Sequence, residues 1–213
     1  MLRLPYFLEK KINDALGTFH LTIQTEIRNP DGKLVKRHKQ MCKSFTGNFL
    51  QALYMQACAG NTTDFVVSSF NGGNNTNIKA TDGFNASSAS LLMKLNAAAN
   101  SSAFGIVCGT GSSAPTALDY KLETLISSGS GAGQLSYLAQ GAYQAPSAVG
   151  NTTSFILQRL FQNNSAGEID VAELGIYFSI GAGAPICIAR DLVTDPILAG
   201  QSYTVQYTYQ VTT

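Results

Sequence analysis

The feature that most constrains the fold is the strict alternation of side chains in residues 202–211, SYTVQYTYQV. Successive residues of a β-strand point to opposite faces, so this alternation predicts a strand with one buried and one exposed face. We expect the apolar set to face the core, although tyrosine is also enriched in binding surfaces. That set is Tyr203, Val205, Tyr207, Tyr209 and Val211.

The same alternation occurs near the start of the chain, in residues 18–28 (TFHLTIQTEIR). The next four residues, Asn29-Pro30-Asp31-Gly32, form a strong turn signal, because proline presets one dihedral and glycine supplies a positive one. A more polar stretch, residues 33–39, follows. This order predicts a β-hairpin with a charged second strand, and lysines on such a strand discourage pairing at a sheet edge.

One helix is predicted, over residues 46–59, where apolar side chains recur at helical spacing. Ser44 or Thr46 can cap its start, and Gly60 with Asn61 can end it. We expect this helix to pack on a sheet.

Short strands at regular spacing fill much of the remaining chain. They are predicted at residues 104–108, 134–143, 152–161, 168–180 and 185–193, with less regular segments at 64–70, 76–81 and 90–95 that fit strands or short turns. In addition, we predict a loop at 146–150, one helical turn at 115–119, and a bulge near Ala172 or Glu173 where the alternation slips.

The pattern as a whole predicts a mainly β protein: an antiparallel β-sandwich, jelly-roll-like, with an N-terminal β-hairpin and one short α-helix. We divide it into residues 1–60, holding the basic segment, hairpin and helix, and residues 61–213, the sandwich body. The two parts can also fold as one unit.

Charge is scarce: 14 Lys and Arg stand against 13 Asp and Glu, so 13% of the residues are charged, about half the usual share of roughly 25%. A net charge of +1 with 45% hydrophobic residues excludes a disordered chain. A pI near 7.6 argues against a strongly basic nucleic-acid binder. A globular β protein remains.

The charge is also unevenly placed. Residues 1–43 hold nine basic and four acidic groups, a net of +5, and residues 44–213 hold five basic and nine acidic groups, a net of −4. Such a division suits assembly through the basic end, and a solvated basic hairpin is the alternative. The predicted assembly interface consists of Arg3, Lys10, Lys11, Arg28, Lys33, Lys36, Arg37, Lys39 and Lys43.

We predict no catalytic, cofactor-binding or metal-binding residues, and no enzymatic activity. His20 and His38 lie in no recognisable catalytic context. Gly109-Thr110-Gly111 is expected to be a turn rather than a phosphate-binding loop. Glu168 and Asp170 are expected on one solvated strand face, because the acidic loop of a calcium site is missing, and the slip in the alternation leaves the side of Glu173 open. The scattered cysteines Cys42, Cys58, Cys108 and Cys187 are expected to be mostly buried thiols.

Two classes of partner are not expected. The basic stretch at residues 33–43 lacks the interleaved aromatic residues of single-strand binders, so we do not expect nucleic acid as a partner. No run of about 18 apolar residues occurs in the chain, so no membrane span is predicted.

Three segments together resemble a known family: residues 105–126, residues 173–179 (ELGIYFS) and residues 186–211. In the last, an apolar strand leads into Ala189-Arg190-Asp191, followed by a proline-containing turn, a glycine turn and a Thr/Tyr-rich final strand. This ending resembles that of tailed-bacteriophage virion proteins, and the likeness covers residues 105–213.

The resemblance implies a virion structural protein: a capsid decoration or head-fibre protein, or a neck or tail component. The expected partners are other virion proteins and further copies of the chain, and the expected location is the virion, after synthesis in the host cytoplasm. The alternative is a receptor- or glycan-binding module of a tail or head fibre, using exposed tyrosines and the Asn-rich residues 71–77.

Overall fold

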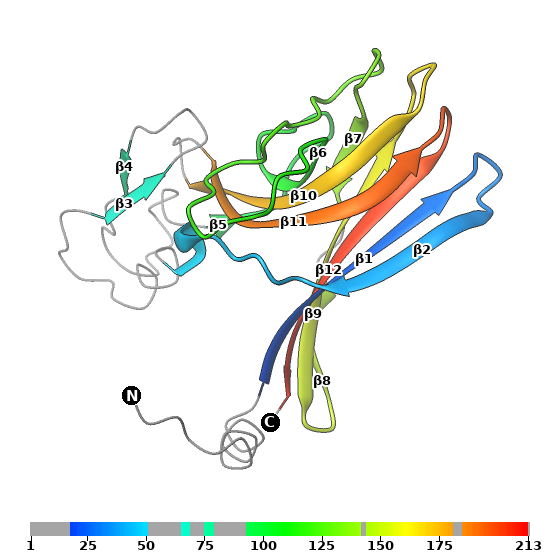
Figure 1. Ribbon diagram of the computed structural model, residues 1–213. Helices are drawn as coiled ribbons and strands as arrows, with labels where there is room; N and C mark the ends of the chain where they lie inside the picture. Colours follow the sequence, from blue (N-terminus) through cyan, green and yellow to red (C-terminus); the bar gives the residue numbers. More distant parts are fainter. Residues whose placement is uncertain are drawn as a thin grey trace.

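The computed structural model describes residues 18–50, 65–68, 75–78, 93–141, 144–180 and 185–212. Within these ranges the chain is mainly β, and Figure 1 shows two large antiparallel sheets. The strands are β1 (Thr18–Arg28), β2 (Leu34–Met41), β3 (Phe65–Ser68), β4 (Asn75–Ile78), β5 (Met93–Lys94), β6 (Gly105–Gly109), β7 (Ser136–Gln140), β8 (Gln144–Val149), β9 (Thr152–Gln162), β10 (Ile169–Ile180), β11 (Ile186–Ile197) and β12 (Ser202–Thr212).

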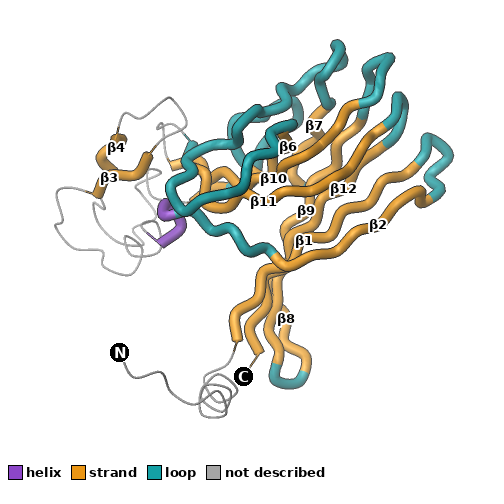
Figure 2. Tube along the Cα trace, in the orientation of Figure 1, coloured by secondary structure: helices purple, strands orange, loops and turns teal. Residues whose placement is uncertain are grey.

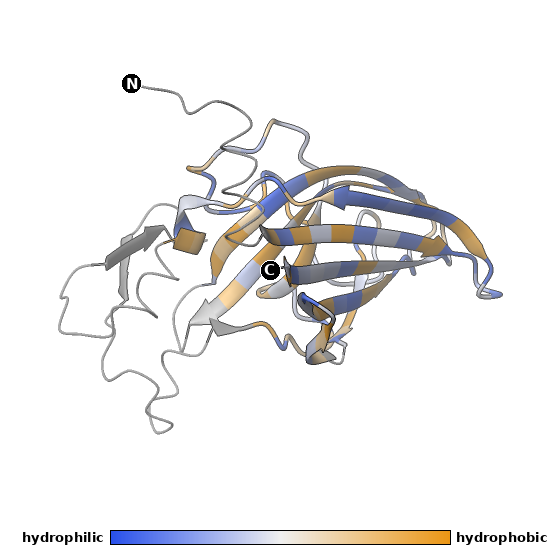
Figure 3. Ribbon diagram, turned by 90° about the horizontal axis from the view of Figure 1, so that it is seen from below, coloured by the Kyte–Doolittle hydropathy of each residue, from blue (hydrophilic) through white to orange (hydrophobic). Residues whose placement is uncertain are grey.

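The first sheet has the order β2-β1-β12-β9-β7, and β8 also pairs with β9. Its centre is the β1–β12 pair, which runs without interruption from Thr18↔Thr212 to Arg28↔Ser202. The predicted alternation is confirmed here. Of the apolar set in β12, Tyr203, Val205, Tyr207 and Tyr209 are buried, and Val211 is 43% exposed. Figure 3 shows the resulting bands of opposite hydropathy along the strands.

The second sheet places β10 between β11 on one side and β6 and β5 on the other. All five residues of β6 are buried, and so is nearly every described residue of β10. Both faces of this sheet are therefore covered: the inner face by the first sheet, and the outer face by the loop between β6 and β7. The predicted bulge is confirmed between Val171 and Glu173.

The two sheets face each other in a sandwich-like arrangement. The core between them contains Ile23 and Ile27 of β1, Leu157 and Phe161 of β9, and Ile188 and Ile197 of β11, together with the tyrosines of β12. Figure 2 shows the β1–β2, β9–β10 and β11–β12 turns gathered at one end of the molecule. The predicted fold class is confirmed.

The chain passes from the first sheet to the second directly after β2. Phe45 forms a β-bridge with Ala189 of β11, Thr46 donates its backbone N–H to the carbonyl of Ile188, and Arg190 donates its own to the carbonyl of Ser44. This crossing segment covers part of the outer edge of β11. Of the predicted helix 46–59, residues 47–50 are helical and residues 51–59 lie outside the described residues.

The β1–β2 turn forms as predicted, with the N–H of Gly32 donated to the carbonyl of Asn29 at 2.8 Å and Gly32 at a φ of 83°. Two other local predictions are wrong. Residues 115–119 contain a hydrogen-bonded turn, Asp119 N to Thr116 O, rather than helix. Residues 144–149, which include Pro146, form the strand β8 rather than a loop. Proline fits because the β8–β9 register is irregular between Gln144 and Ser147.

One arginine in the core of the first sheet was not anticipated. Arg159 of β9 is fully buried. Its guanidinium donates to the backbone carbonyls of Ala98, Ser101, Phe104, Ile106 and Leu138 at 2.7 to 3.1 Å, and it lies 4.8 Å from the ring centre of Tyr137. Because a buried charge needs such partners, Arg159 holds the segment leading into β6 against β7 and β9.

Candidate assembly surface

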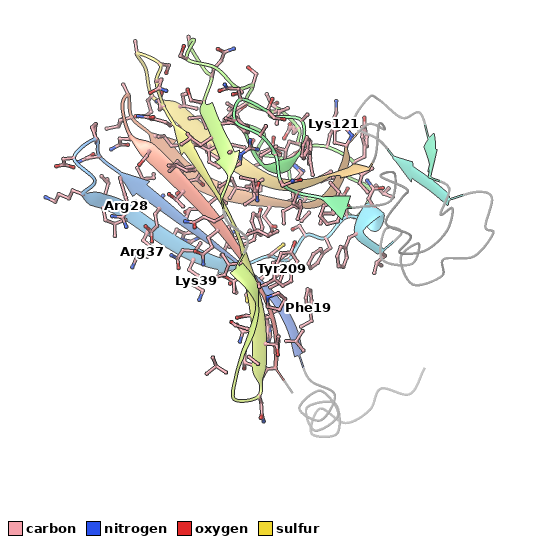
Figure 4. The ribbon with its side chains drawn as sticks, turned by 180° about the vertical axis from the view of Figure 1, so that it is seen from behind. Phe19, Arg28, Arg37, Lys39, Lys121 and Tyr209 are labelled. Atoms are coloured by element: carbon pink, nitrogen blue, oxygen red, sulfur yellow. The ribbon has the colours of Figure 1, made fainter. Side chains whose placement is uncertain are left out.

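The predicted basic interface lies on the β1–β2 hairpin. In β1 the side chains at Gln24 and Glu26 point away from the core, because Ile23, Thr25 and Ile27 are buried. Directly paired residues share a face, and the pairs are Glu26↔Arg37 and Gln24↔Lys39. Arg37 and Lys39 therefore lie on the outer face of the first sheet. Figure 4 shows them with Arg28 along the hairpin.

Two of the arginines on this face are held by one carboxylate. Glu26 accepts hydrogen bonds from Arg28 Nη2 at 2.7 Å and from Arg37 Nε at 2.9 Å. Burial alone would raise the pKa of Glu26, but the hydrogen bonds and charges of Arg28 and Arg37 outweigh it and leave this pKa below its ordinary value. These arginines are oriented, and part of their charge is neutralised.

Lys36 points the other way, toward the second sheet. Its Nζ lies 2.8 Å from Oδ1 of the buried Asp195 in β11 and donates to the carbonyl of Thr194. Gln40, four residues further along β2 on the same face, donates to the carbonyl of Leu192 at 2.9 Å. These side chains link the edges of the two sheets, and a groove of about 290 Å³ remains between β2 and β11, beside His38.

Three lysines remain for contact with a partner. Lys33, Lys39 and Lys43 are exposed, and none forms an ion pair with any residue in the described ranges. The structure thus gathers the predicted residues Arg28, Lys33, Lys36, Arg37, Lys39 and Lys43 on the hairpin and the segment after it, although Lys36 faces inward. The predicted residues Arg3, Lys10 and Lys11 lie outside the described residues.

A second cluster of charge lies on the opposite sheet, around Arg190 of β11, whose side chain is 3% exposed. Its Nε donates to Glu173 at 2.6 Å, its Nη1 to Asp119 at 2.8 Å, and its Nη2 to the carbonyl of Ser113 at 3.0 Å. Glu123 lies 3.5 Å away. We call this set, Arg190 with Glu173, Asp119 and Glu123, the Arg190 latch.

The structure settles the position of Glu173, whose side of the strand the sequence left open. Glu168 and Asp170 are exposed as predicted, but Glu173 is fully buried. Besides Arg190, its carboxylate accepts the backbone N–H groups of Gly111, Glu123 and Thr124 at 2.8 to 3.1 Å. The bulge after Val171 shifts the alternation of β10, so Glu173 turns toward the loop that covers the second sheet.

The glycines before this loop have a role that the turn interpretation missed. A Cβ added to Gly109 would lie 2.5 Å from Oε1 of Glu173, and one added to Gly111 would lie 2.4 Å from Cβ of Glu123. Neither glycine has a positive φ. They are therefore needed for close approach: they leave space for the buried carboxylate.

A groove of about 220 Å³ opens beside the latch, lined by Tyr120, Lys121 and latch residues. Burial would lower the pKa of Arg190, but its bonds to Glu173 and Asp119 raise it. Burial would likewise raise the pKa of Asp119, but hydrogen bonds from Thr116 and Arg190 keep it below its usual value. These charges satisfy one another, so the arrangement is suited to fastening the loop to the sheet.

The other candidate groups are placed as follows. His20 is half-buried on the outer face of β1, and His38 is exposed and contacts Gln40 at 3.1 Å. Cys42, Cys108 and Cys187 are buried free thiols, and burial raises the pKa of each. Cys58 lies outside the described residues. The buried tyrosines of β12 offer no exposed platform for a sugar.

Within the described ranges, no group of three or more His, Cys, Asp or Glu side chains is placed to hold a metal ion. In the same ranges, no helix is long and apolar enough to cross a bilayer. Comparisons with protein-family models, curated proteins and solved structures found no match.

Proposed function

We propose that this protein is a non-enzymatic structural component of a bacteriophage virion that docks on another virion protein through the basic outer face of its β1–β2 hairpin. The observation that carries the docking step is the set Lys33, Lys39 and Lys43, which is exposed without ion pairs to other described residues. Basic groups on a rigid strand pair attract an acidic partner and orient it. The virion assignment rests on the family resemblance of residues 105–213.

The elements that hold β2 in place support a docking role for the hairpin. β2 is joined to β1 along its length, and Lys36 and Gln40 tie it to β11. Of the exposed lysines, Lys39 lies on this strand, and Lys33 and Lys43 lie just before and just after it. Partners that meet through such a preorganised surface lose little conformational entropy on binding.

Charge reversal tests the docking step. The triple variant Lys33→Glu/Lys39→Glu/Lys43→Glu should still fold, because all three side chains are exposed, but its incorporation into particles should fall by at least about tenfold. The matched control is Lys121→Glu, an exposed lysine away from the hairpin (Figure 4). Equal incorporation of the triple variant and the control would contradict docking through this face.

The virion assignment has a separate test. Mass spectrometry of purified particles should detect the chain at a fixed copy number relative to the major shell protein. A chain abundant in infected cells but missing from purified particles would refute the assignment. A glycan array probed with the purified protein tests the receptor-binding alternative, and strong selective binding would favour that alternative over a purely structural role.

A further inference from the structure

The end of the first sheet opposite the hairpin turn extends beyond the second sheet, as Figures 1 and 4 show. We call this part the projecting end: residues 18–21 of β1, 209–212 of β12, 152–155 of β9 and 144–149 of β8. The register joins these segments into one four-stranded patch. Phe155 stacks on Tyr209 at a centroid distance of 4.4 Å, and Phe19 lies 6.3 Å from the same ring.

On the face that continues the core, the row of side chains nearest the end of this patch is uncharged, largely apolar and exposed. Phe19 pairs with Val211, Val211 with Thr153, and Thr153 with Ala148, so the four side chains share the face that continues the core. Phe19 is 51% exposed and Val211 is 43% exposed, and Thr153 and Ala148 are also exposed. On the other face of β8, Val149 is 81% exposed. Contiguous exposed apolar groups of this kind mark interaction sites.

The patch also contains no Asp, Glu, Lys or Arg. The scarcity extends along the chain, since residues 124–158 and residues 196–213 contain none of these residues either. A surface designed to keep copies of a protein apart contains roughly 25–35% charged residues. The projecting end has no such protection.

The missing charge favours a second copy of this chain as the partner. In a symmetric interface the same patch is used by both subunits, so a charged residue near the axis meets its own copy and is repelled. An uncharged apolar patch avoids that repulsion, whereas docking on a charged partner would favour complementary charges. Pro146 in the edge strand β8 removes a backbone donor and so disfavours addition of a further strand there. Two copies can therefore associate by packing their exposed faces against each other, rather than by joining strand edges.

We propose that the face formed by Phe19, Val211, Thr153 and Ala148 is an interface between copies of this chain. The exposed aromatic and aliphatic side chains of one copy pack against those of the next, and the aromatic stack behind them supports the contact. This interface lies at the opposite end of the first sheet from the hairpin turn. It is independent of the proposed docking step, so one can fail while the other holds.

Sedimentation velocity over a concentration series of the full chain tests the interface. The wild type should self-associate, and Val211→Asp and Phe19→Asp should each weaken association by at least about tenfold, since each places like charges together. The matched control is Leu198→Asp in the β11–β12 turn at the other end, where the leucine is also 51% exposed. It should associate as the wild type does. Circular dichroism on each variant verifies folding.

Three results would overturn the proposal. One is a wild type that stays monomeric at about 100 μM, a concentration at which even weak complexes form. Another is folded Val211→Asp and Phe19→Asp variants that associate as strongly as the control. The third is a monomeric full chain that begins to associate when residues 1–17 are deleted, which would make this chain's own N-terminal segment the occupant of the face.

Discussion

The Arg190 latch and the projecting end use charge in opposite ways. At the latch, one arginine and three carboxylates meet beside a sheet that is covered on both faces. At the projecting end there is no Asp, Glu, Lys or Arg, and Phe19 and Val211 are exposed on the face that continues the core. Buried charges must be satisfied within the chain, whereas exposed apolar groups gain most from a partner. The charged groups of the latch find all their partners within the chain, whereas the apolar groups of the projecting end would be buried by association with a partner.

The largest effect is expected from breaking the latch. Arg190→Leu leaves the fully buried carboxylate of Glu173 without its cation, and loss of one partner of a buried pair typically costs about 3–5 kcal/mol. Urea denaturation measures the change in the free energy of unfolding. Lys121→Leu, an exposed lysine beside the same groove, should change it by less than about 0.5 kcal/mol. Similar values for the two variants would show that the latch contributes nothing.

A smaller effect is expected from filling the space beside the carboxylate. Gly111→Ala places a Cβ 2.4 Å from that of Glu123, and overpacking of this kind costs about 1–3 kcal/mol. Gly167→Ala is the matched control, because nothing lies within 4 Å of its added Cβ. Thermal unfolding of both variants compares them. A Gly111→Ala protein as stable as the control would mean that the loop can move away freely.

At the projecting end we expect a moderate and local effect. Phe155→Ala removes a half-buried ring from the stack on Tyr209, and the expected loss is about 1–2 kcal/mol, below the 3–5 typical of a fully buried phenylalanine. Hydrogen exchange should quicken in residues 152–155 but not in β6. Leu160→Ala, on the outer face of the same strand, is the control. Equal exchange in both variants would contradict a stabilising stack.

The smallest effect concerns pH. The pKa of Asp119 is lowered in the folded protein, so its contribution to stability is present above the unfolded pKa, near 3.8, and is lost as pH falls through the folded value. The side chain of Asp119 is 20% exposed, so water partly screens its ion pair with Arg190, and we expect a contribution of about 1 kcal/mol. The Asp119→Asn variant should therefore lose stability less steeply than the wild type below pH 4, measured by urea midpoints. Parallel curves would contradict a lowered pKa.

Local patterns predicted the first sheet well and the latch poorly. The alternation in β1 and β12 and the turn at Asn29–Gly32 depend on neighbours in the sequence, so they are visible in it. The partners of Arg190, in contrast, lie 17 residues away at Glu173 and 71 away at Asp119. Only a weak signal was present: charged residues within the apolar run ICIARDLV, which a buried strand tolerates only with partners.

The candidate assembly surface was predicted in part. Strand register places Arg37 and Lys39 on one face and Lys36 on the other, which alternation along residues 33–39 could have shown. The bond of Lys36 to Asp195 could not have been foreseen, because it spans the edges of two sheets. The projecting end could not have been predicted from the sequence either, since its exposure depends on how far the second sheet extends over the first.

The continuous register of β1 and β12 has a mechanical consequence. Backbone hydrogen bonds of antiparallel strands run perpendicular to the strands. A load between the hairpin turn and the projecting end therefore acts along the strands and strains all eleven residue pairs at once. A pull that separates Thr18 from Thr212 opens the pairs one after another. The molecule is thus stiffest in tension along the line joining its two proposed contacts.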